Sequence, residues 1–285
     1  MSEKNIKIGI VGHGFVGKAV DFGFSVNVDK TIIDPLYETS IDDLKEISPE
    51  IIFVCVPTPM KKNGAIDCSI IVDVVEEITK NKINSIIVIK SSVTPSILKQ
   101  CDNINPNNIV YNPEFLTERN ANHDFVNPNI LVIGGSEKNS KFLYEVYKKH
   151  STCMDCPVFY TDTVTASLVK YTLNTFLASK VLFMNEIHKI FTSLNTISSW
   201  EEFTAILMAE GRIGPSHMQV PGPDGKLGFG GACFPKDLSA LINFAEEEGE
   251  TLELLKSVRK INNDIRSNYK ALELREKEQN VNFDN

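Results

Sequence analysis

The sequence predicts an α/β protein in which a doubly wound parallel sheet is followed by an all-helical domain. In the first half, short runs rich in Ile and Val alternate with helical patterns, which is typical of parallel strands covered by helices on both faces. After about residue 163 these runs stop, and one long helix without Pro or Gly is expected from 163 to about 194. We therefore expect a sheet domain at 1–163, a helical domain at 164–275 and a polar tail at 276–285.

The expected strands are short apolar runs, several of which are apolar at every position. Continuous apolar runs of this length are typical of strands buried on both faces. They lie at 6–11, 30–34, 51–56, 86–90, 109–111, 130–134 and 157–160.

Capping residues and apolar periodicity predict the helices. One helix follows Asp67, whose carboxylate suits an N-cap, and another follows Thr94, with Pro95 in its first turn. Beyond the long helix, further helices are expected at about 200–209, 235–248 and 251–270. The last residues are polar and are expected to be frayed.

The composition limits the class of protein. A chain of 285 residues with 42% hydrophobic and 23% charged residues suits a folded protein of about two domains. A net charge of −8 without a basic run disfavours nucleic acid and anionic membrane surfaces. No apolar stretch approaches the ~20 residues that span a bilayer, so we expect no membrane association.

The cysteines indicate a reducing compartment. Six cysteines without a recognisable export signal favour thiols and a cytoplasmic location. Cys153 and Cys156 form one CxxC pair, but no second ligand pair for zinc lies near it, and a strand rather than a helix is expected after it. We interpret the pair as structurally incidental and expect no metal.

A glycine motif, GHGFVG (12–17), follows the first expected strand and opens a helix. Gly12 permits a tight turn, Gly14 lets the backbone approach a pyrophosphate, and Gly17 lets the helix pack close to the strand. The helix N-terminus offers N–H groups to phosphate. Asp34 ends the second strand about 20 residues on, where a carboxylate binds ribose hydroxyls and repels a 2′-phosphate. The motif predicts a Rossmann domain that binds NAD rather than NADP.

The segment GFGGACFPKD (228–237) contains a candidate nucleophile. Its glycines form a loop that another molecule can approach closely, and Pro235 suits the first turn of a helix. Cys233 is therefore expected at a helix N-terminus with Lys236 nearby, and both lower the pKa of a thiol. Asp237, one turn on, could orient neighbouring groups or take a proton. The alternative is that Cys233 is a buried structural cysteine.

Other polar residues are ambiguous when each is taken alone. Lys170 and Asn174 share one face of the long helix and could stabilise a developing alkoxide, although for these two residues alone a solvated helix face is the better explanation. Glu114, Glu118 and Ser92 each follow a predicted strand, and ligands of such sheets bind at the carboxyl ends of the strands.

Together these segments resemble the UDP-glucose/GDP-mannose dehydrogenase family. The matching motifs follow one another in order along the whole chain, and the last of them is highly specific. After the glycine motif they are VCVPTP (54–59), IKSSVTP (89–95), NPEFLTE (112–118), VKYTLNTFLASK (169–180), GRIG (211–214) and GFGGACFPKD (228–237).

The resemblance implies an oxidoreductase that uses NAD for the four-electron oxidation of a UDP-glucose-like nucleotide sugar to the uronic acid, as in polysaccharide biosynthesis. Cys233 would form a thiohemiacetal and then a thioester, which water hydrolyses with Glu114 as general base. Lys170 and Asn174 would stabilise the oxyanion, and Asp237 would assist proton movement or order a water molecule.

The resemblance also implies the residues that bind cofactor and substrate. The cofactor-binding residues would be Gly12, Gly14, Phe15, Val16, Gly17, Asp34, Pro57, Thr58, Ser92, Glu118 and Lys236. The substrate-binding residues would be Phe115, Leu116, Arg212, Phe229 and Gly230. Arg212 matches an arginine that the family extends into the neighbouring subunit, which implies a homodimer through the helical domain.

The chain departs from the family pattern at four places, of which Ala232 in place of serine is a mild change. Arg119 stands where the family has glycine, and arginine would be strained there if that glycine needs a positive φ. The loop at 215–227 is longer than usual, and the second Rossmann-like domain expected after the helical domain is lacking. A separate polypeptide could supply that domain.

Two alternatives to this function follow from the sequence. The chain could be the NAD-binding half of a split or catalytically idle enzyme that needs a partner domain. It could also be a two-electron, hydroxyacid-type dehydrogenase. Cys233 argues against the latter, because a single hydride step needs no thiol nucleophile.

Overall fold

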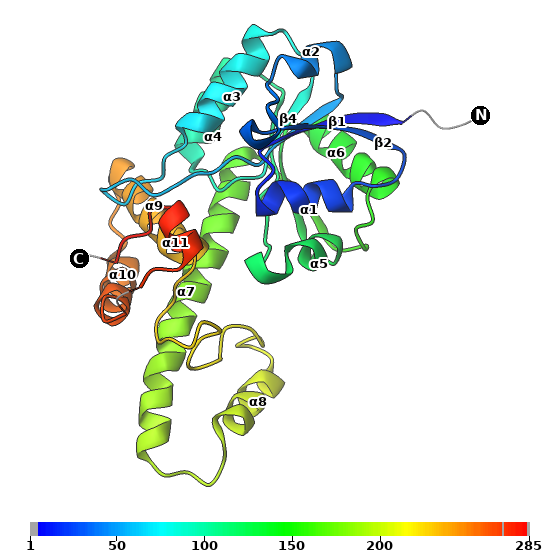
Figure 1. Cartoon of the computed structure of the whole chain (residues 1–285). Helices are drawn as coiled ribbons and strands as arrows, with labels where there is room; N and C mark the ends of the chain where they lie inside the picture. The colour runs from blue at the N-terminus through cyan, green and yellow to red at the C-terminus, as the bar shows by residue number, and fades with distance from the viewer. Residues whose placement is uncertain (1–4, 270, 284–285) are drawn as a thin grey trace. The chain divides into compact units, whose positions relative to one another are not determined.

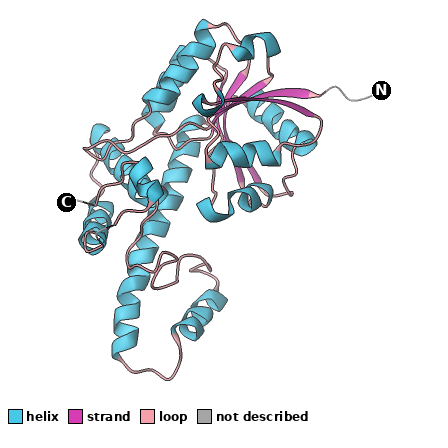
Figure 2. Ribbon diagram, viewed as in Figure 1, coloured by secondary structure: helices cyan, strands magenta, loops and turns pink. Residues whose placement is uncertain are grey.

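The computed structural model describes residues 5–269 and 271–283. Their contacts define two compact units: unit 1 comprises the chain up to Thr58 and Asp67–Lys170, and unit 2 comprises Pro59–Ile66 and the chain from Tyr171. All strands found in the described residues belong to unit 1, and unit 2 is built from helices and loops (Figure 2). The first two turns of the long helix belong to the sheet unit rather than to the predicted helical domain, because they bond to the loops at the strand ends.

Unit 1 contains a seven-stranded sheet with the strand order β2-β1-β3-β4-β5-β6-β7. The strands are β1 (Ile6–Val11), β2 (Val28–Ile33), β3 (Ile51–Val54), β4 (Ile86–Ile89), β5 (Ile109–Tyr111), β6 (Leu131–Gly135) and β7 (Val158–Thr161). Every strand that the apolar runs predict is present, and each observed strand begins and ends within two residues of the predicted positions.

One strand pair departs from the predicted parallel order. Strands β1 to β5 pair in parallel, but β5 pairs antiparallel with β6, and β7 then runs parallel to β6. The carboxyl ends of β1 to β5 therefore share one edge of the sheet, and those of β6 and β7 lie at the opposite edge.

Helices cover both faces of the sheet (Figure 1). They are α1 (Phe15–Gly23), α2 (Asp43–Ile47), α3 (Ser69–Lys80), α4 (Pro95–Ile104), α5 (Ala121–Val126) and α6 (Glu137–His150). Thr94 is the N-cap of α4 as predicted, whereas α3 begins after Cys68, and Asp67 accepts a hydrogen bond from the Ser69 N–H. Helices α1, α5 and α6 pack against one face, and Leu44 of α2 packs against Gly9 and Ile52 on the other.

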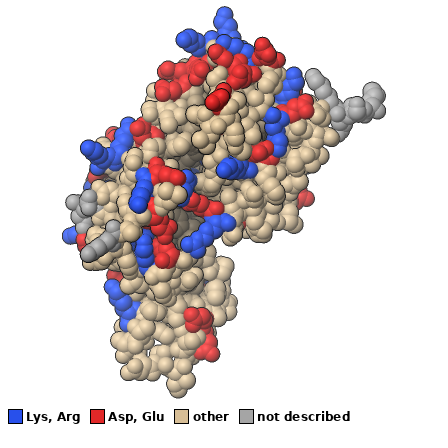
Figure 3. Space-filling model, viewed as in Figure 1, with Lys and Arg blue, Asp and Glu red and all other residues tan. Residues whose placement is uncertain are grey.

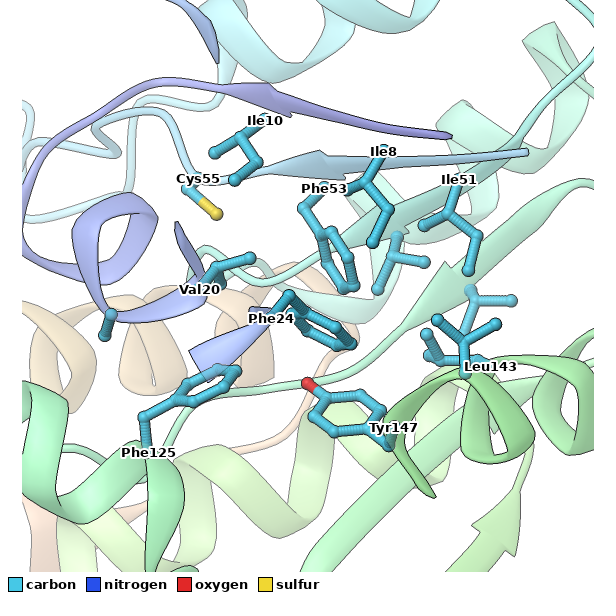
Figure 4. Close-up of a cluster of buried hydrophobic side chains, with 14 of the residues drawn as sticks. Ile8, Ile10, Val20, Phe24, Ile51, Phe53, Cys55, Phe125, Leu143 and Tyr147 are labelled. Carbon is cyan, nitrogen blue, oxygen red and sulfur yellow. The ribbon is translucent and has the colours of Figure 1, made fainter. Parts of the chain in front are cut away.

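Aromatic side chains fill the core beneath α1, α5 and α6 (Figure 4). Phe24, directly after α1, lies with its ring centroid 5.0 Å from that of Phe53 and 4.8 Å from that of Tyr147. Each such buried ring contributes about 1.5–3 kcal/mol. The Tyr147 ring also brings one hydroxyl group into this apolar environment.

Unit 2 is organised along the long helix α7 (Thr163–Ser193), whose first turns belong to unit 1. It continues with α8 (Trp200–Glu210), α9 (Cys233–Glu247), α10 (Glu253–Arg266) and α11 (Leu274–Glu278). A capping box of Ser199 and Glu202 starts α8. One apolar cluster joins α7, α9 and α10, and another joins α7, α8 and the 218–227 loop.

The predicted polar tail is folded where the structure describes it, so the expectation of a frayed end is wrong for residues 274–283. Glu276 is fully buried, and Val281 and Phe283 are buried as well. The Phe283 ring lies 5.5 Å from the Arg266 guanidinium. Buried charges with partners far away in sequence hold this segment, and local polarity does not reveal such partners. No helix in the described part of the chain combines the length and hydropathy that a membrane crossing requires.

Candidate active site

The glycine motif forms the turn between β1 and α1. Gly12 has φ +87°, and a Cβ there would lie 2.9 Å from the backbone of Cys55; a Cβ on Gly17 would lie 2.0 Å from the Gly12 carbonyl oxygen. Both glycines are therefore required by contacts within unit 1. Gly14, the N-cap of α1, differs because no described atom comes within 4 Å of the position of its Cβ. The open side of Gly14 is where a ligand can approach the backbone.

Asp34 lies at the end of β2, and its carboxylate is held by two backbone groups. One oxygen accepts a hydrogen bond from the His13 N–H at 2.7 Å, and the other accepts one from the Leu36 N–H at 3.0 Å. An oriented carboxylate at this strand end, an open glycine and the N–H groups of α1 together fit a dinucleotide with an unphosphorylated ribose.

Five further predicted cofactor residues of unit 1 lie after strands of the sheet or at the start of α1. Thr58 and Ser92 are buried after β3 and β4, and Pro57 is exposed. The Val16 side chain packs into the core of Figure 4 with Phe15 against it, so the backbone of this turn is the part left to contact a cofactor.

Glu114 and Lys170 form a buried ion pair in unit 1. The Lys170 ammonium donates to the Glu114 carboxylate at 3.0 Å and to the Glu114 carbonyl oxygen at 2.5 Å, and both side chains are at most 5% exposed. The second carboxylate oxygen accepts from the Leu116 N–H at 2.7 Å. The Phe115 ring lies 5.5 Å from the ammonium. Glu114, Phe115, Leu116 and Lys170 thus meet in one cluster, although Lys170 follows Glu114 by 56 positions in the sequence.

Glu118 and Arg119 lie in an exposed 3₁₀ turn, Glu118–Asn120. Arg119 is not among the residues with positive φ. The strain that the loss of the family glycine suggested is therefore absent at this position.

A buried lysine behind the Glu114 loop was not predicted. The Lys90 ammonium, at the end of β4, donates to the Asn112 side-chain oxygen at 2.9 Å and to its carbonyl oxygen at 3.1 Å, and the Tyr147 hydroxyl donates to the same side chain at 2.7 Å. Burial lowers the pKa of Lys90 to about 8. The group holds the chain two residues before Glu114. Lys90 belongs to the quoted motif IKSSVTP, which is the signal that could have identified it.

Asp237 is the centre of a second buried group, which lies in unit 2. One carboxylate oxygen accepts from the Asn174 amide at 2.6 Å and the other from the Lys236 ammonium at 2.7 Å. Asp237 is fully buried, and Lys236 and Asn174 are 5% and 8% exposed. Asn174 is thus oriented by a carboxylate rather than solvated, and the Lys236 ammonium is directed to Asp237.

Cys233 is the first residue of α9 and is half-buried. The helix N-terminus predicted for it is confirmed, and Asp237 follows one turn later on the same helix. The lowered thiol pKa that this position favours stays a prediction.

The glycines before Cys233 serve mostly for contacts within unit 2. A Cβ on Gly228 would lie 2.6 Å from the Asn262 side chain, and one on Gly230 would lie 2.1 Å from Arg266 and 2.5 Å from Glu276. Gly231 has φ +74°, and no described atom comes within 4 Å of its Cβ position. Sequence reasoning missed these partners, because Arg266 and Glu276 lie in stretches that look like solvent-exposed polar chain.

Arg212 lies in an exposed segment directly after α8. Its side chain is 87% exposed and pairs with Glu210 at the end of α8. The loop that carries it is held by the buried Lys180, whose ammonium donates to the carbonyl oxygens of Ile213, Gly214 and Ser216.

The cysteine pair shows no sign of a metal site. Cys153 and Cys156 are both half-buried thiols, and the Cys153 thiol donates to the Phe125 carbonyl oxygen at 3.2 Å. Within the described residues, no group of three or more His, Cys, Asp or Glu side chains could hold a metal ion.

Comparisons with known proteins agree with this geometry. Residues 37–151 match the NAD binding domain of the UDP-glucose/GDP-mannose dehydrogenase family, and residues 164–264 match its central domain. A UDP-glucose 6-dehydrogenase of Rickettsia felis is 31% identical over 291 residues, which cover 92% of this chain and 62% of that protein. YtcA of Bacillus subtilis is 32% identical over 301 residues, covering 90% of this chain and 67% of YtcA.

Solved structures show the same fold. A UDP-glucose dehydrogenase from Pyrobaculum islandicum superposes with a TM-score of 0.77 at 25% identity, covering 92% of this chain and 68% of that one. A UDP-D-ManNAc dehydrogenase from Pyrococcus horikoshii superposes with a TM-score of 0.72 at 20% identity, which supports the fold alone. The chain spans less than two thirds of the Rickettsia relative. The matched NAD binding domain confirms the predicted cofactor, and the chain belongs to the UDP-glucose/GDP-mannose dehydrogenase family.

Proposed function

We propose that this chain carries out the NAD-dependent, four-electron oxidation of the primary alcohol of a UDP-glucose-like nucleotide sugar to the uronic acid, through a thioester on Cys233. The observation that carries the proposal is the place of Cys233 as the first residue of α9, four residues before the buried Asp237 that orients Asn174. A thiol so placed has no use in a single hydride transfer. The names of the relatives support the substrate class.

Two NAD molecules, bound one after the other, would supply the acceptors, one for each hydride. Cys233 supplies the covalent chemistry: its thiolate sulfur adds to the aldehyde carbon left by the first oxidation, which forms a C–S bond. The second oxidation converts this thiohemiacetal to a thioester. Water then attacks the thioester carbon, the C–S bond breaks, and the acid and the thiol are released.

Asn174 and Lys170 stabilise the oxygen that becomes negative when sulfur or water adds to the carbonyl carbon. Asp237 accepts one amide hydrogen of Asn174, which leaves the other to donate to an oxyanion. The Lys170 ammonium adds a positive charge in a buried environment, where an electrostatic contact is stronger than in water.

Glu114 acts as the general base for hydrolysis. The Lys170 ammonium and the Leu116 N–H each donate to one of its oxygens, so the carboxylate is held in one orientation. A carboxylate oxygen can accept more than one hydrogen bond, so these contacts still allow Glu114 to take a proton from the attacking water.

The test is to incubate the protein with NAD and a panel of UDP- and GDP-sugars and to measure NADH formed per sugar. We expect two NADH per sugar and an acid product, both lost in Cys233→Ala. Cys156→Ala, which removes another half-buried thiol, is the matched control and should keep both. A Cys233→Ala protein that still forms the acid would overturn the thioester mechanism.

The same assay separates the alternatives. One NADH per sugar with an aldehyde or ketone product would indicate a two-electron dehydrogenase. NAD binding without turnover, followed by turnover when the C-terminal domain of a relative is added, would indicate half of a split enzyme. NAD binding without turnover in either case would indicate an idle protein.

We also propose that the chain forms a homodimer through α7. Phe176, Phe183 and Ile190 repeat every seven residues and are 61%, 57% and 57% exposed, so they form one apolar stripe along the helix. In Figure 3 the end of unit 2 that carries α8 is mostly tan, with one red patch of acidic side chains at α8. Light scattering should show a dimer that Phe183→Glu dissociates, whereas Leu36→Glu, at an 85% exposed position of unit 1, leaves the dimer intact.

We propose that the protein is cytoplasmic. In the described part of the chain, which includes all six cysteines, no disulfide is formed, although Cys153 and Cys156 are only three residues apart. Thiols of this kind persist in a reducing compartment.

A further inference from the structure

We propose that Arg266 and Glu276 are positioning residues for the loop Gly228–Gly231, and through it for Cys233. The inference rests on the proposed function, since it assigns a role to the loop before the nucleophile. Neither residue lies within 164–264, the part of the chain that matches the family's central domain. No motif quoted above includes them either.

Asn262 holds the first half of the loop. Its side-chain oxygen accepts from the Phe229 N–H at 2.7 Å, and its amide donates to the Phe229 carbonyl oxygen at 3.0 Å. Asn262 is 1% exposed, and one such pair satisfies both backbone groups of a buried residue. The loop is thus bonded to α10 by a pair of hydrogen bonds resembling those between strands.

Glu276 holds the second half of the loop. Its Oε1 accepts from the Gly231 N–H at 3.0 Å and from Arg266 Nη2 at 3.1 Å, and its Oε2 accepts from the Glu273 N–H at 2.8 Å. The side chain is fully buried. A buried carboxylate must be paired and hydrogen-bonded to persist, and these three donors meet that requirement.

Arg266 joins Glu276 to a second loop. Arg266 lies one turn after Asn262 on α10 and is 2% exposed, and its Nη1 donates to the Asp224 carboxylate at 2.7 Å. Its guanidinium occupies the space beside Gly230 that any Cβ would fill. The planar fork of arginine can serve two carboxylates at once, which a lysine ammonium does less well.

The loop needs such support because its own backbone does not select one conformation. Gly228 and Gly231 both have positive φ, at +71° and +74°, and glycine adopts several other conformations at equal cost. Cys233 follows Gly231 by two residues and starts α9. The buried side chains therefore decide where the thiol lies at the start of the helix.

Hydrogen exchange of Glu276→Gln and Arg266→Lys tests the proposal, because each variant keeps the size or the charge of the side chain. Glu278→Gln is the matched control, since Glu278 lies on the same short helix in an exposed pair with Arg275. In both test variants the amides of 228–233 should exchange at least ~10-fold faster, with amides in the middle of α7 unchanged. The control should exchange like the wild type.

A second readout follows the thiol itself and does not depend on sugar oxidation. Alkylation of Cys233 by iodoacetamide, followed by peptide mass spectrometry across pH, should show a midpoint raised by about half a unit or more in Arg266→Lys, which keeps the charge of the side chain. The proposal would be overturned if a folded test variant kept both the amide exchange rates and the alkylation midpoint of the wild type. Equal changes in the control Glu278→Gln would overturn it as well. If the protein oxidises no sugar, these two measurements still decide whether Arg266 and Glu276 position the loop Gly228–Gly231.

Discussion

The two glycine-rich loops look alike in sequence but are supported differently. In the GHGFVG loop, Gly12 and Gly17 lie against backbone atoms of unit 1, whereas in the GFGG loop Gly228 and Gly230 lie against buried side chains of unit 2. Each loop leaves one glycine open, Gly14 in the first and Gly231 in the second. A glycine-rich motif therefore indicates that other atoms lie close to the loop backbone, and most of these atoms belong to the chain itself. In each loop, one glycine stays accessible to a ligand.

The largest expected effect contrasts backbone support with side-chain support. Gly17→Ala should lower the free energy of unfolding by about 3 kcal/mol, because the new Cβ would lie 2.0 Å from the Gly12 carbonyl oxygen, a backbone atom that no side-chain rotation can move. Gly230→Ala should cost less, about 2 kcal/mol, because Arg266 and Glu276 can shift. Urea denaturation of both variants measures the difference. A larger loss in Gly230→Ala would contradict this distinction.

Gly14→Ala tests whether the open glycine is reserved for the cofactor. The free energy of unfolding should change by less than about 0.5 kcal/mol, because the new methyl meets no described atom. The affinity for NAD should fall about tenfold, which is about 1.4 kcal/mol, because the methyl keeps the backbone from the pyrophosphate. Isothermal titration calorimetry gives the affinity, and unchanged binding would show that the cofactor does not approach this glycine.

Gly231 tests the open position of the second loop. Gly231→Ala should cost about 1–2 kcal/mol from the left-handed backbone alone, and Gly231→Asn should cost less, because asparagine tolerates this conformation. Equal stability of the alanine variant and the wild type would mean that the loop adopts another conformation in solution.

The smallest effect distinguishes the buried cations of the two units. Burial lowers the pKa of Lys90 to about 8 in the folded protein, while the unfolded chain keeps lysine protonated to about 10.4. Between pH 7 and 9 the unfolded state therefore binds more protons, and stability rises with pH. Relative to Lys90→Met, the wild type should gain about 1 kcal/mol across this interval.

Arg266 supplies the control for this pH dependence. Arginine is not deprotonated in proteins over this range, so the difference in free energy of unfolding between the wild type and Arg266→Met should be the same at pH 7 and pH 9. Cys55 lies near Lys90, and burial raises the pKa of its thiol to about 12. This thiol therefore keeps its proton in the folded protein between pH 7 and pH 9. A flat Lys90 difference would mean that the lysine is solvated.

The sequence predicts the strands well and the buried ion pairs poorly. The runs that became β3 and β4 are apolar at every position, and only burial on both faces suits such runs. The direction of β6 could not be predicted, because pairing with β5 is a tertiary contact. Glu276 sits among charged neighbours in LREKE and reads as exposed; its burial depends on Arg266, ten residues away.

The candidate site shows the same limit. The glycines, Asp34 and Cys233 were predicted because motif and element boundary coincide at each of them. The role of Lys170 was ambiguous, because no residue near it in the sequence indicates that Glu114 accepts its hydrogen bonds. Lys90 and Asn112 were missed for the same reason. Buried polar residues that hold a loop through partners distant in the sequence leave no local sequence pattern.

The reversed direction of β6 and β7 has a consequence for how the chain can vary in length. Because β7 ends at the opposite edge of the sheet, α7 must run back about 10 Å, the rise of seven residues from Thr163, before Lys170 meets Glu114. One residue gained or lost in that stretch would turn Lys170 by about 100° around the helix. We therefore expect the first two turns of α7 to be fixed in length.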